Sequence, residues 1–190
     1  AGGAGAASEM REGGAVRGPA GYYALCARSP ELCPRPIAAA AGAPQAQAAR
    51  LDAAGLAQLE VFNASVNARY RPMTDREAHG VADLWSLPTD AADCEDYVLA
   101  KRAALLAAGW PESALLIGVV VGSDSPYHAV LVVRTNHGEL VLDNLRDEIL
   151  DWRETGYQWA VRQSKRDPSQ WVLVDGAELS GGVIAPAAAR

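Results

Sequence analysis

The chain has 190 residues, of which 49% are hydrophobic, and a formal net charge of −6 at pH 7. A chain of this length can bury a core of its own, so we expect a single domain. The acidic balance argues against a basic face for nucleic acid, and no apolar run reaches the ~18–20 residues of a membrane span. We therefore expect neither a nucleic-acid partner nor a membrane-embedded segment.

The two ends of the chain are predicted to lie outside this domain. Residues 1–20 combine Gly, Ala and scattered charge without periodicity, which is typical of a flexible lead-in. Residues 177–190 are again rich in Gly and Ala and predict a loose tail. The folded domain is therefore expected over residues 21–176. Its first stretch, through Pro44, is predicted to be a loop because an Ala- and Pro-rich composition disfavours a helix.

Two of the three cysteines lie in that loop. Cys26 and Cys33 flank the stretch Ala-Arg-Ser-Pro-Glu-Leu, a spacing that allows a small disulfide. A disulfide would indicate an oxidising compartment, whereas two free thiols fit the same spacing. If Cys26 and Cys33 are paired, Cys94 is the cysteine that stays free.

The first long helix is predicted to begin after Asp52, a residue type that caps helices, and to end before Pro72. Apolar residues recur in it at intervals of three and four positions, as in an amphipathic helix. These residues are Leu56, Leu59, Phe62, Val66 and Tyr70.

Residues 71–92 form a long connection, and connections of this length inside compact domains are often functional. It carries Trp85, Pro88 and the acids Asp75, Asp83 and Asp90.

A second helix is predicted from about Asp93 to Ala108, with Gly109 as its stop signal. The residues on one side of it are Cys94, Tyr97, Val98, Leu105 and Ala108. Cys94 therefore lies in the first turn of a helix whose inner face is apolar.

Strand-like runs follow the two helices. They cover Ala114–Val121, Tyr127–Arg134, Glu139–Asp143, Tyr157–Val161 and Gln170–Val174, and the second and third are joined by the turn Thr135-Asn136-His137-Gly138. Helices that precede strands predict an α+β fold, with N-terminal helices packed on an antiparallel β-sheet.

Cys94, His128 and Asp143 are the candidate catalytic residues. A helix N-terminus and a nearby imidazolium both favour the thiolate, which is the reactive form of cysteine. His128 opens one strand, and Asp143 ends the next. A Cys followed by a His and then by an Asp that fixes the imidazole is the order of a papain- or transglutaminase-type triad.

The hairpin register tests this hypothesis. If Arg134 pairs with Glu139, then Val130 pairs with Asp143, and His128 and Asp143 become diagonal neighbours on one face of the sheet. Diagonal neighbours are ~7–8 Å apart, within reach of an imidazole and a carboxylate. A slip of one residue would send Asp143 to the opposite face.

Three carboxylates surround the cysteine: Asp93, Glu95 and Asp96. The dipole at a helix N-terminus favours such acids, which is sufficient to explain them. Yet a carboxylate beside a thiol opposes its ionisation, and a hard cation would relieve this conflict. Oxygen ligands without a nearby His fit Ca²⁺ better than Zn²⁺.

Each of these residues also has a purely structural explanation. A cysteine on an apolar helix face is often a small buried hydrophobe. A His that opens a strand is often a surface residue, and Asp143-Asn144 after a strand is often only a turn.

The same residues carry a resemblance to a known family, the bacterial transglutaminase-like cysteine peptidases. The resemblance covers roughly residues 22–175, with Ala92 standing where the family usually has Gly. The motifs are Val66-Asn67, Asp83-Leu84-Trp85-Ser86-Leu87-Pro88, Asp93-Cys94-Glu95-Asp96-Tyr97 with Lys101, His128-Ala129-Val130-Leu131 and Val141-Leu142-Asp143-Asn144.

The resemblance implies a papain/transglutaminase-like fold with a catalytic triad. In it, Cys94 is the nucleophile, His128 is the general base and acid, and Asp143 orients the imidazole. The resemblance also implies Ca²⁺ bound by Asp93, Glu95 and Asp96. The backbone N–H of Cys94 would donate to the oxyanion, with a second donor from Asn67 or the Trp85 loop.

The implied compartment is the periplasm, in agreement with a Cys26–Cys33 bridge. The implied substrate is the N-terminal region of a large surface adhesin, cut after a pair of small residues, which releases a biofilm. An inner-membrane cyclic-di-GMP receptor is the implied regulatory partner.

Two other functions fit the same residues. A transglutaminase-like enzyme would transfer the acyl group from Cys94 to an amine instead of water. A non-catalytic calcium-binding interaction module would keep the acids and merely bury Cys94.

Overall fold

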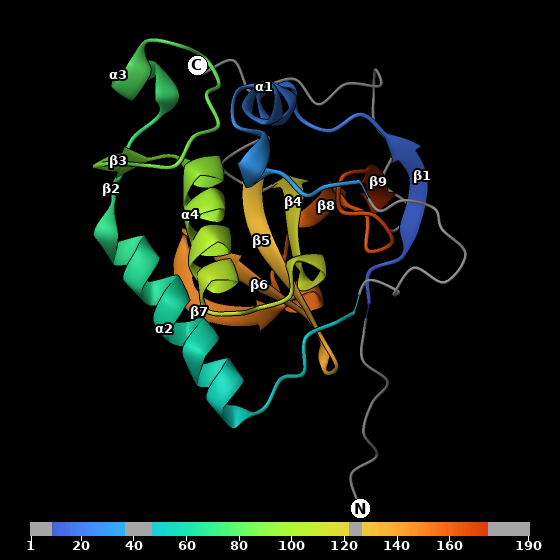
Figure 1. Cartoon of the computed structure of the whole chain (residues 1–190). Coiled ribbons are helices and arrows are strands. Elements are labelled where there is room, and N and C mark those ends of the chain that lie inside the picture. The colour runs from blue at the N-terminus through green and yellow to red at the C-terminus, as the bar shows by residue number, and fades with distance from the viewer. Residues whose placement is uncertain (1–8, 37–46, 122–126, 175–190) are drawn as a thin grey trace, which may run out of the picture.

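The computed structural model describes residues 9–36, 47–121 and 127–174. Its centre is an antiparallel sheet in the order β1-β9-β8-β4-β5-β6-β7, with the longer helices on one face (Figure 1). The strands are β1 (Glu12–Val16), β4 (Leu115–Val121), β5 (His128–Thr135), β6 (Gly138–Asp143), β7 (Arg146–Asp151), β8 (Gln158–Gln163) and β9 (Trp171–Val174).

The helices are α1 (Ala20–Arg28), α2 (Ala53–Arg69), α3 (Asp75–His79) and α4 (Cys94–Ala107). Short 3-10 turns are η1 (Pro30–Leu32), η2 (Glu112–Ala114) and η3 (Trp152–Glu154), and β2 (Arg71–Pro72) pairs in parallel with β3 (Ala91–Ala92). This arrangement confirms the predicted α+β class. None of the helices in the described ranges is both long and apolar enough to cross a bilayer.

The two long helices form where the sequence predicts them. The side chain of Asp52 accepts a hydrogen bond from the Gly55 amide at 2.7 Å and so caps α2. Asp93 is the N-cap of α4, and Gly109 follows its end with a φ of +87°, a left-handed conformation that favours glycine. Figure 1 shows α4 in front of β5 and α2 along the β7 edge of the sheet, and both pairs of elements are in contact.

The main core lies between these helices and the sheet. Because side chains alternate along a strand, odd-numbered residues of β4 and β5 enter this core. Its fully buried members include Leu59 of α2, Leu105 of α4, and Leu115, Leu131 and Leu142 from the strands. The opposite face of the sheet has apolar clusters of its own, packed against Trp152 and Trp159.

The β5–β6 hairpin has the predicted register. Arg134 pairs with Glu139, and Leu131 pairs with Leu142. His128 begins β5 and Asp143 ends β6, so both lie at the same end of the hairpin. The N-terminus of α4 meets this end of the sheet, because the backbone amide of Ala129 interacts with the sulfur of Cys94.

The expected lead-in over residues 1–20 is wrong for its described part. Residues 12–16 form β1, which pairs with β9 at the edge of the sheet, and Met10 is fully buried. Charges hold this segment in place: Arg162 pairs with Glu139 at 2.6 Å and Glu12 at 3.3 Å. These partners are too distant in sequence for composition to reveal them.

Two further expectations need correction. The stretch through Pro44 was predicted to lack a helix, yet α1 forms over residues 20–28, before the Pro-rich part begins. The strand β7 was not predicted, because its polar sequence Arg-Asp-Glu lacks the alternation of a half-buried strand. The predicted tail, residues 177–190, lies outside the described residues.

Candidate active site

His128 and Asp143 are joined by a hydrogen bond. The distance between His128 Nε2 and Asp143 Oδ1 is 2.8 Å, and both side chains are almost fully buried. The hairpin register therefore produces the contact that the sequence predicts. With Nε2 turned to the carboxylate, the second ring nitrogen, Nδ1, is the one that can exchange a proton with another group.

The carboxylate of Asp143 has further donors besides His128. Its Oδ1 accepts from the Leu145 amide at 3.0 Å, and its Oδ2 accepts from the Tyr157 hydroxyl at 2.5 Å. Burial raises the pKa of Asp143, but the hydrogen bond and charge of His128 and these donors outweigh it. They lower the pKa to about 2. Asp143 is therefore a carboxylate at neutral pH and can stabilise a protonated imidazole.

Cys94 is the first residue of α4, so its sulfur lies at the positive end of the helix dipole. Its thiol donates to Glu95 Oε2 at 3.1 Å. Burial is the main cause that raises the pKa of Cys94, and the charge of Glu95 raises it further. In the described part of the chain, this thiol has Glu95, and not His128, as its side-chain hydrogen-bond partner. In this arrangement the thiol proton points to Glu95.

The predicted metal ligands lie in one acidic cluster, which we call the acid cluster. Two sets of carboxylates within it have oxygens that all lie within 4.8 Å of one another. These sets are Asp75, Asp83 and Glu95, and Asp75, Asp93 and Asp96. The sequence predicts Asp93, Glu95 and Asp96 as ligands, whereas it gives Asp75 and Asp83 only as acids of the connection between the helices.

The acid cluster opposes its own ionisation. Burial raises the pKa of Asp93 and Glu95, and each is raised further by a neighbouring carboxylate. Burial also raises the pKa of Asp96, to about 7. The Oδ1 atom of Asp93 is buried without a hydrogen-bond partner. Carboxylates that crowd together in this way can be satisfied by protons or by a hard cation with oxygen ligands.

Hydrogen bonds within the connection over residues 71–92, and from it to α4, hold the connection near Cys94. Asp75, at the start of α3, accepts from the Leu84 amide. The Ser86 amide donates to Asp96 Oδ1 at 2.8 Å. No periodic pattern encodes these links, so the sequence predicted a functional connection without predicting its path.

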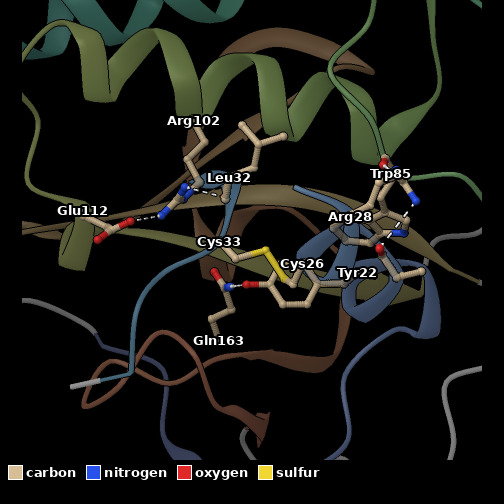
Figure 2. Close-up of a disulfide and its surroundings, with 10 residues drawn as sticks. Tyr22, Cys26, Arg28, Leu32, Cys33, Trp85, Arg102, Glu112 and Gln163 are labelled. Carbon is tan, nitrogen blue, oxygen red and sulfur yellow. Dashed lines mark hydrogen bonds and ion pairs between the residues drawn. A yellow bond between two sulfur atoms is a disulfide. The ribbon is translucent and has the colours of Figure 1, made fainter. Parts of the chain in front are cut away.

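Cys26 and Cys33 form the predicted disulfide, which joins α1 to the chain after η1. Figure 2 shows this bridge beneath α4, with Arg28 next to Trp85. Arg28 Nη2 donates to the Trp85 carbonyl at 2.8 Å, and Arg102 of α4 donates to the Leu32 carbonyl at 3.1 Å. The disulfide therefore braces the segment that holds the Trp85 loop beside the site.

Asn67 does not have the arrangement expected of an oxyanion donor. Its amide nitrogen donates to the Asp143 carbonyl at 3.0 Å, to the Arg146 carbonyl at 3.2 Å and to Asp147 Oδ1 at 2.9 Å. These bonds fasten α2 to the turn after β6. Asn67 therefore supports the Asp143 backbone, and the Cys94 amide remains the donor proposed for the oxyanion.

Two residues near Asp143 carried no functional prediction. Tyr157 contacts both members of the His128–Asp143 pair. Lys101 is almost fully buried, and burial lowers its pKa to about 7, while Asp143 and Asp147 act in the opposite direction. For Tyr157 the sequence indicates only a strand-forming residue and gives no sign of a functional role. For Lys101 the only signal was its place in the motif that begins at Asp93.

Comparison with known proteins gives an independent assignment. Residues 12–178 match the profile of the bacterial transglutaminase-like cysteine proteinase BTLCP. No curated protein matches the chain.

Solved structures of Legionella pneumophila LapG are similar to this chain. One shares 27% sequence identity over 57% of this chain and 63% of its own length, with a TM-score of 0.49. That match spans less than two thirds of the relative. The calcium-bound form shares 25% identity over 67% of this chain and 75% of its own length, with a TM-score of 0.51.

Proposed function

The chain belongs to the bacterial transglutaminase-like cysteine proteinases, and we propose that it is a calcium-dependent cysteine endopeptidase with a Cys94–His128–Asp143 triad. The observation that carries this proposal is the buried hydrogen bond of 2.8 Å between His128 and Asp143. Ala129, the residue after His128 in β5, interacts through its backbone with Cys94 at the N-terminus of α4.

The three residues share the chemistry of the reaction. Asp143 accepts the Nε2–H of His128, so Nδ1 can take the proton of the Cys94 thiol. The thiolate then attacks the carbonyl carbon of the scissile peptide, and the backbone N–H of Cys94 stabilises the oxyanion. His128 returns the proton to the leaving amine, which leaves an acyl-enzyme on Cys94. A water deprotonated by His128 releases the acyl group as a carboxylate and restores the thiol.

Calcium fits the donor set of this chain. The acid cluster supplies only carboxylate oxygens, and Ca²⁺ prefers oxygen ligands of this kind. One of these oxygens, Asp93 Oδ1, is buried without a hydrogen-bond partner. Asp75, Asp93 and Asp96 would hold it, with Asp83 and Glu95 close by. When bound, the cation neutralises these carboxylates. A Glu95 carboxylate neutralised in this way would be a weaker acceptor for the Cys94 thiol, which would then be able to turn towards His128. The calcium-bound form of Legionella pneumophila LapG supports this assignment.

We further propose that the enzyme works in the periplasm on the N-terminal region of a large surface adhesin, and that an inner-membrane cyclic-di-GMP receptor restrains it. The Cys26–Cys33 disulfide supports an oxidising compartment. The substrate and the receptor rest on the family resemblance, which also implies a cut after a pair of small residues.

A cleavage assay tests the proposal. A candidate adhesin fragment is incubated with the wild type in calcium, with the wild type in EGTA, and with Cys94→Ala in calcium. Only the first sample should cut the fragment, and Cys94→Ala should unfold at the wild-type temperature. Full cleavage by Cys94→Ala would contradict the triad, and full cleavage in EGTA would contradict the calcium requirement. Addition of a labelled amine distinguishes a transferase, because only a transferase would attach it to the product.

A further inference from the structure

We propose that Tyr157 is a positioning residue of this site, which holds the Asp143 carboxylate so that one of its oxygens faces His128. The inference rests on the proposed function, because it concerns the same triad. Tyr157 itself lies one step behind the reacting atoms, and it acts through Asp143.

The two oxygens of Asp143 have different partners, and Oδ1 also accepts from the Leu145 amide at 3.0 Å. Oδ1 is 2.8 Å from Nε2 of His128, and Oδ2 is 2.5 Å from the Tyr157 hydroxyl. A carboxylate held at both oxygens cannot rotate about its last bond without breaking one of these contacts. The hydroxyl at Oδ2, together with the Leu145 amide at Oδ1, therefore fixes the direction in which Oδ1 points, and with it the tautomer of the imidazole.

The aromatic ring of Tyr157 also borders the imidazole. The ring centroids of Tyr157 and His128 are 5.8 Å apart, with an angle of 56° between the planes. The same ring packs against the buried cluster of Val120, Val130 and Val141 on this face of the sheet. One side chain therefore contacts both catalytic partners and the adjacent core.

The local backbone holds Tyr157 in this place. Its amide donates to Thr155 Oγ1 at 3.3 Å, and that hydroxyl in turn donates to the Trp152 carbonyl at 2.8 Å. Gly156, between them, has a φ of +73°, which a residue with a side chain rarely adopts. This turn delivers Tyr157 to the start of β8 with its hydroxyl towards Asp143.

Other charged groups near Asp143 explain why the hydroxyl is needed. Arg146 Nε is 3.7 Å from Oδ2, and the Arg146 guanidinium lies 5.5 Å from the centre of the Tyr157 ring. From α4, the charge of Lys101 also interacts with Asp143. Without the hydroxyl, Oδ2 would keep only these cations as partners, and the Leu145 amide alone would hold Oδ1 towards Nε2. The phenol hydroxyl thus holds Oδ2 in place, although these cations also attract it.

The variant Tyr157→Phe tests this role because it keeps the ring and removes only the hydroxyl. In calcium, kcat should fall about tenfold or more with KM unchanged, since a hydrogen bond to a charged group is lost. The rate of Cys94 alkylation by iodoacetamide at pH 7 should fall in parallel. Tyr97→Phe is the matched control, since it also removes a hydroxyl, one that donates to the Tyr70 carbonyl at 2.7 Å. It should change stability without changing either rate.

Two further measurements separate positioning from structure. In the double variant Tyr157→Phe with Asp143→Asn, the Tyr157 change should cost nothing more, because it acts only through Asp143. The nitrogen NMR signals of the His128 ring should show one tautomer in the wild type and a mixture in Tyr157→Phe. Unchanged kcat and an unchanged tautomer in Tyr157→Phe would overturn the proposal. The NMR result needs no turnover, so it still decides the role of Tyr157 if the chain cleaves no substrate, an outcome that would count only against the proposed function.

Discussion

His128 and Asp143 are fifteen positions apart in sequence, yet Nε2 of one lies 2.8 Å from Oδ1 of the other. The contact exists because the β5–β6 hairpin closes with Arg134 opposite Glu139, which makes the two residues diagonal neighbours on adjacent strands. The hairpin thus brings His128 and Asp143 together, and the strength of the hydrogen bond between them depends on the charge of both side chains.

Replacement of Asp143 by Asn should lower kcat by about 10²–10⁴-fold. An amide can present its N–H to the ring and so favours the wrong tautomer of His128. Steady-state kinetics in calcium measure the effect. Glu148→Gln is a control of the same chemistry on β7, where the side chain is exposed, and it should behave as the wild type. A loss of less than about tenfold in Asp143→Asn would count against the orienting role.

The acids of the connection should matter for calcium as much as those of α4. Asp75→Asn removes a carboxylate shared by both sets of the acid cluster, so we expect calcium affinity to fall about 10–100-fold. Calorimetric titration of the folded protein with CaCl₂ measures this affinity. The matched control is Asp90→Asn, an exposed acid of the same connection outside the cluster. Equal affinities of the two variants would place the cation elsewhere.

Without calcium, the acid cluster should make stability depend on pH. Burial raises the pKa of Asp96 from 3.8 to about 7, so the folded state binds protons more tightly than the unfolded chain. Its contribution is therefore complete below about pH 4 and is lost as the pH rises towards 7. In EGTA, the Tm at pH 5 should exceed that at pH 7 by at least about 2–4 °C.

Calcium provides the control for that measurement. With the carboxylates neutralised, the difference between pH 5 and pH 7 should shrink. The comparison stops at pH 7 because burial lowers the pKa of Lys101 to about 7. Above this pH the unfolded chain binds an extra proton on Lys101, which opposes the continuing loss of stability from Glu95, whose pKa burial raises to about 9. If the Tm in EGTA increased from pH 5 to pH 7, the result would contradict the claim that ionisation of the acid cluster destabilises the fold.

The disulfide should contribute stability but no chemistry. The variant Cys26→Ser with Cys33→Ser removes a small closed loop, which is worth about 2–3 kcal/mol, so the Tm should fall by roughly 5–10 °C. A reducing agent should lower the Tm of Cys94→Ser by a similar amount, since that chain keeps the bridge. If kcat at 25 °C stays near the wild-type value while the Tm falls, the bracing role is supported. An unchanged Tm would argue that the bridge adds nothing.

Local patterns account for much of this fold. Asp52 and Gly109 delimit α2 and α4 through capping chemistry that acts within a few residues. The turn after Thr135 fixes the register that brings His128 to Asp143. Such features can be predicted because the interactions that cause them are short in sequence.

The remaining features depend on long-range contacts. The strand β1 forms because Glu12 pairs with Arg162 and because Met10 packs against Leu116, Val132 and Val174. Asp75 lies beside Asp93 only because a connection without periodicity brings it to the N-terminus of α4. Tyr157 reaches Asp143 from a different hairpin. The residues around β1, Asp75 and Tyr157 in the sequence contain no pattern that predicts these distant partners.

Alkylation of Cys94 by iodoacetamide as a function of pH tests the central claim most directly. In calcium, an imidazole that accepts the thiol proton should give a single adduct on Cys94, at a rate that is already maximal near pH 7. In His128→Ala, the same rate should be reached only as the pH approaches the pKa of a free thiol, about 8.5. A wild-type profile identical to that of His128→Ala would show that the imidazole does not activate the sulfur and would contradict the account.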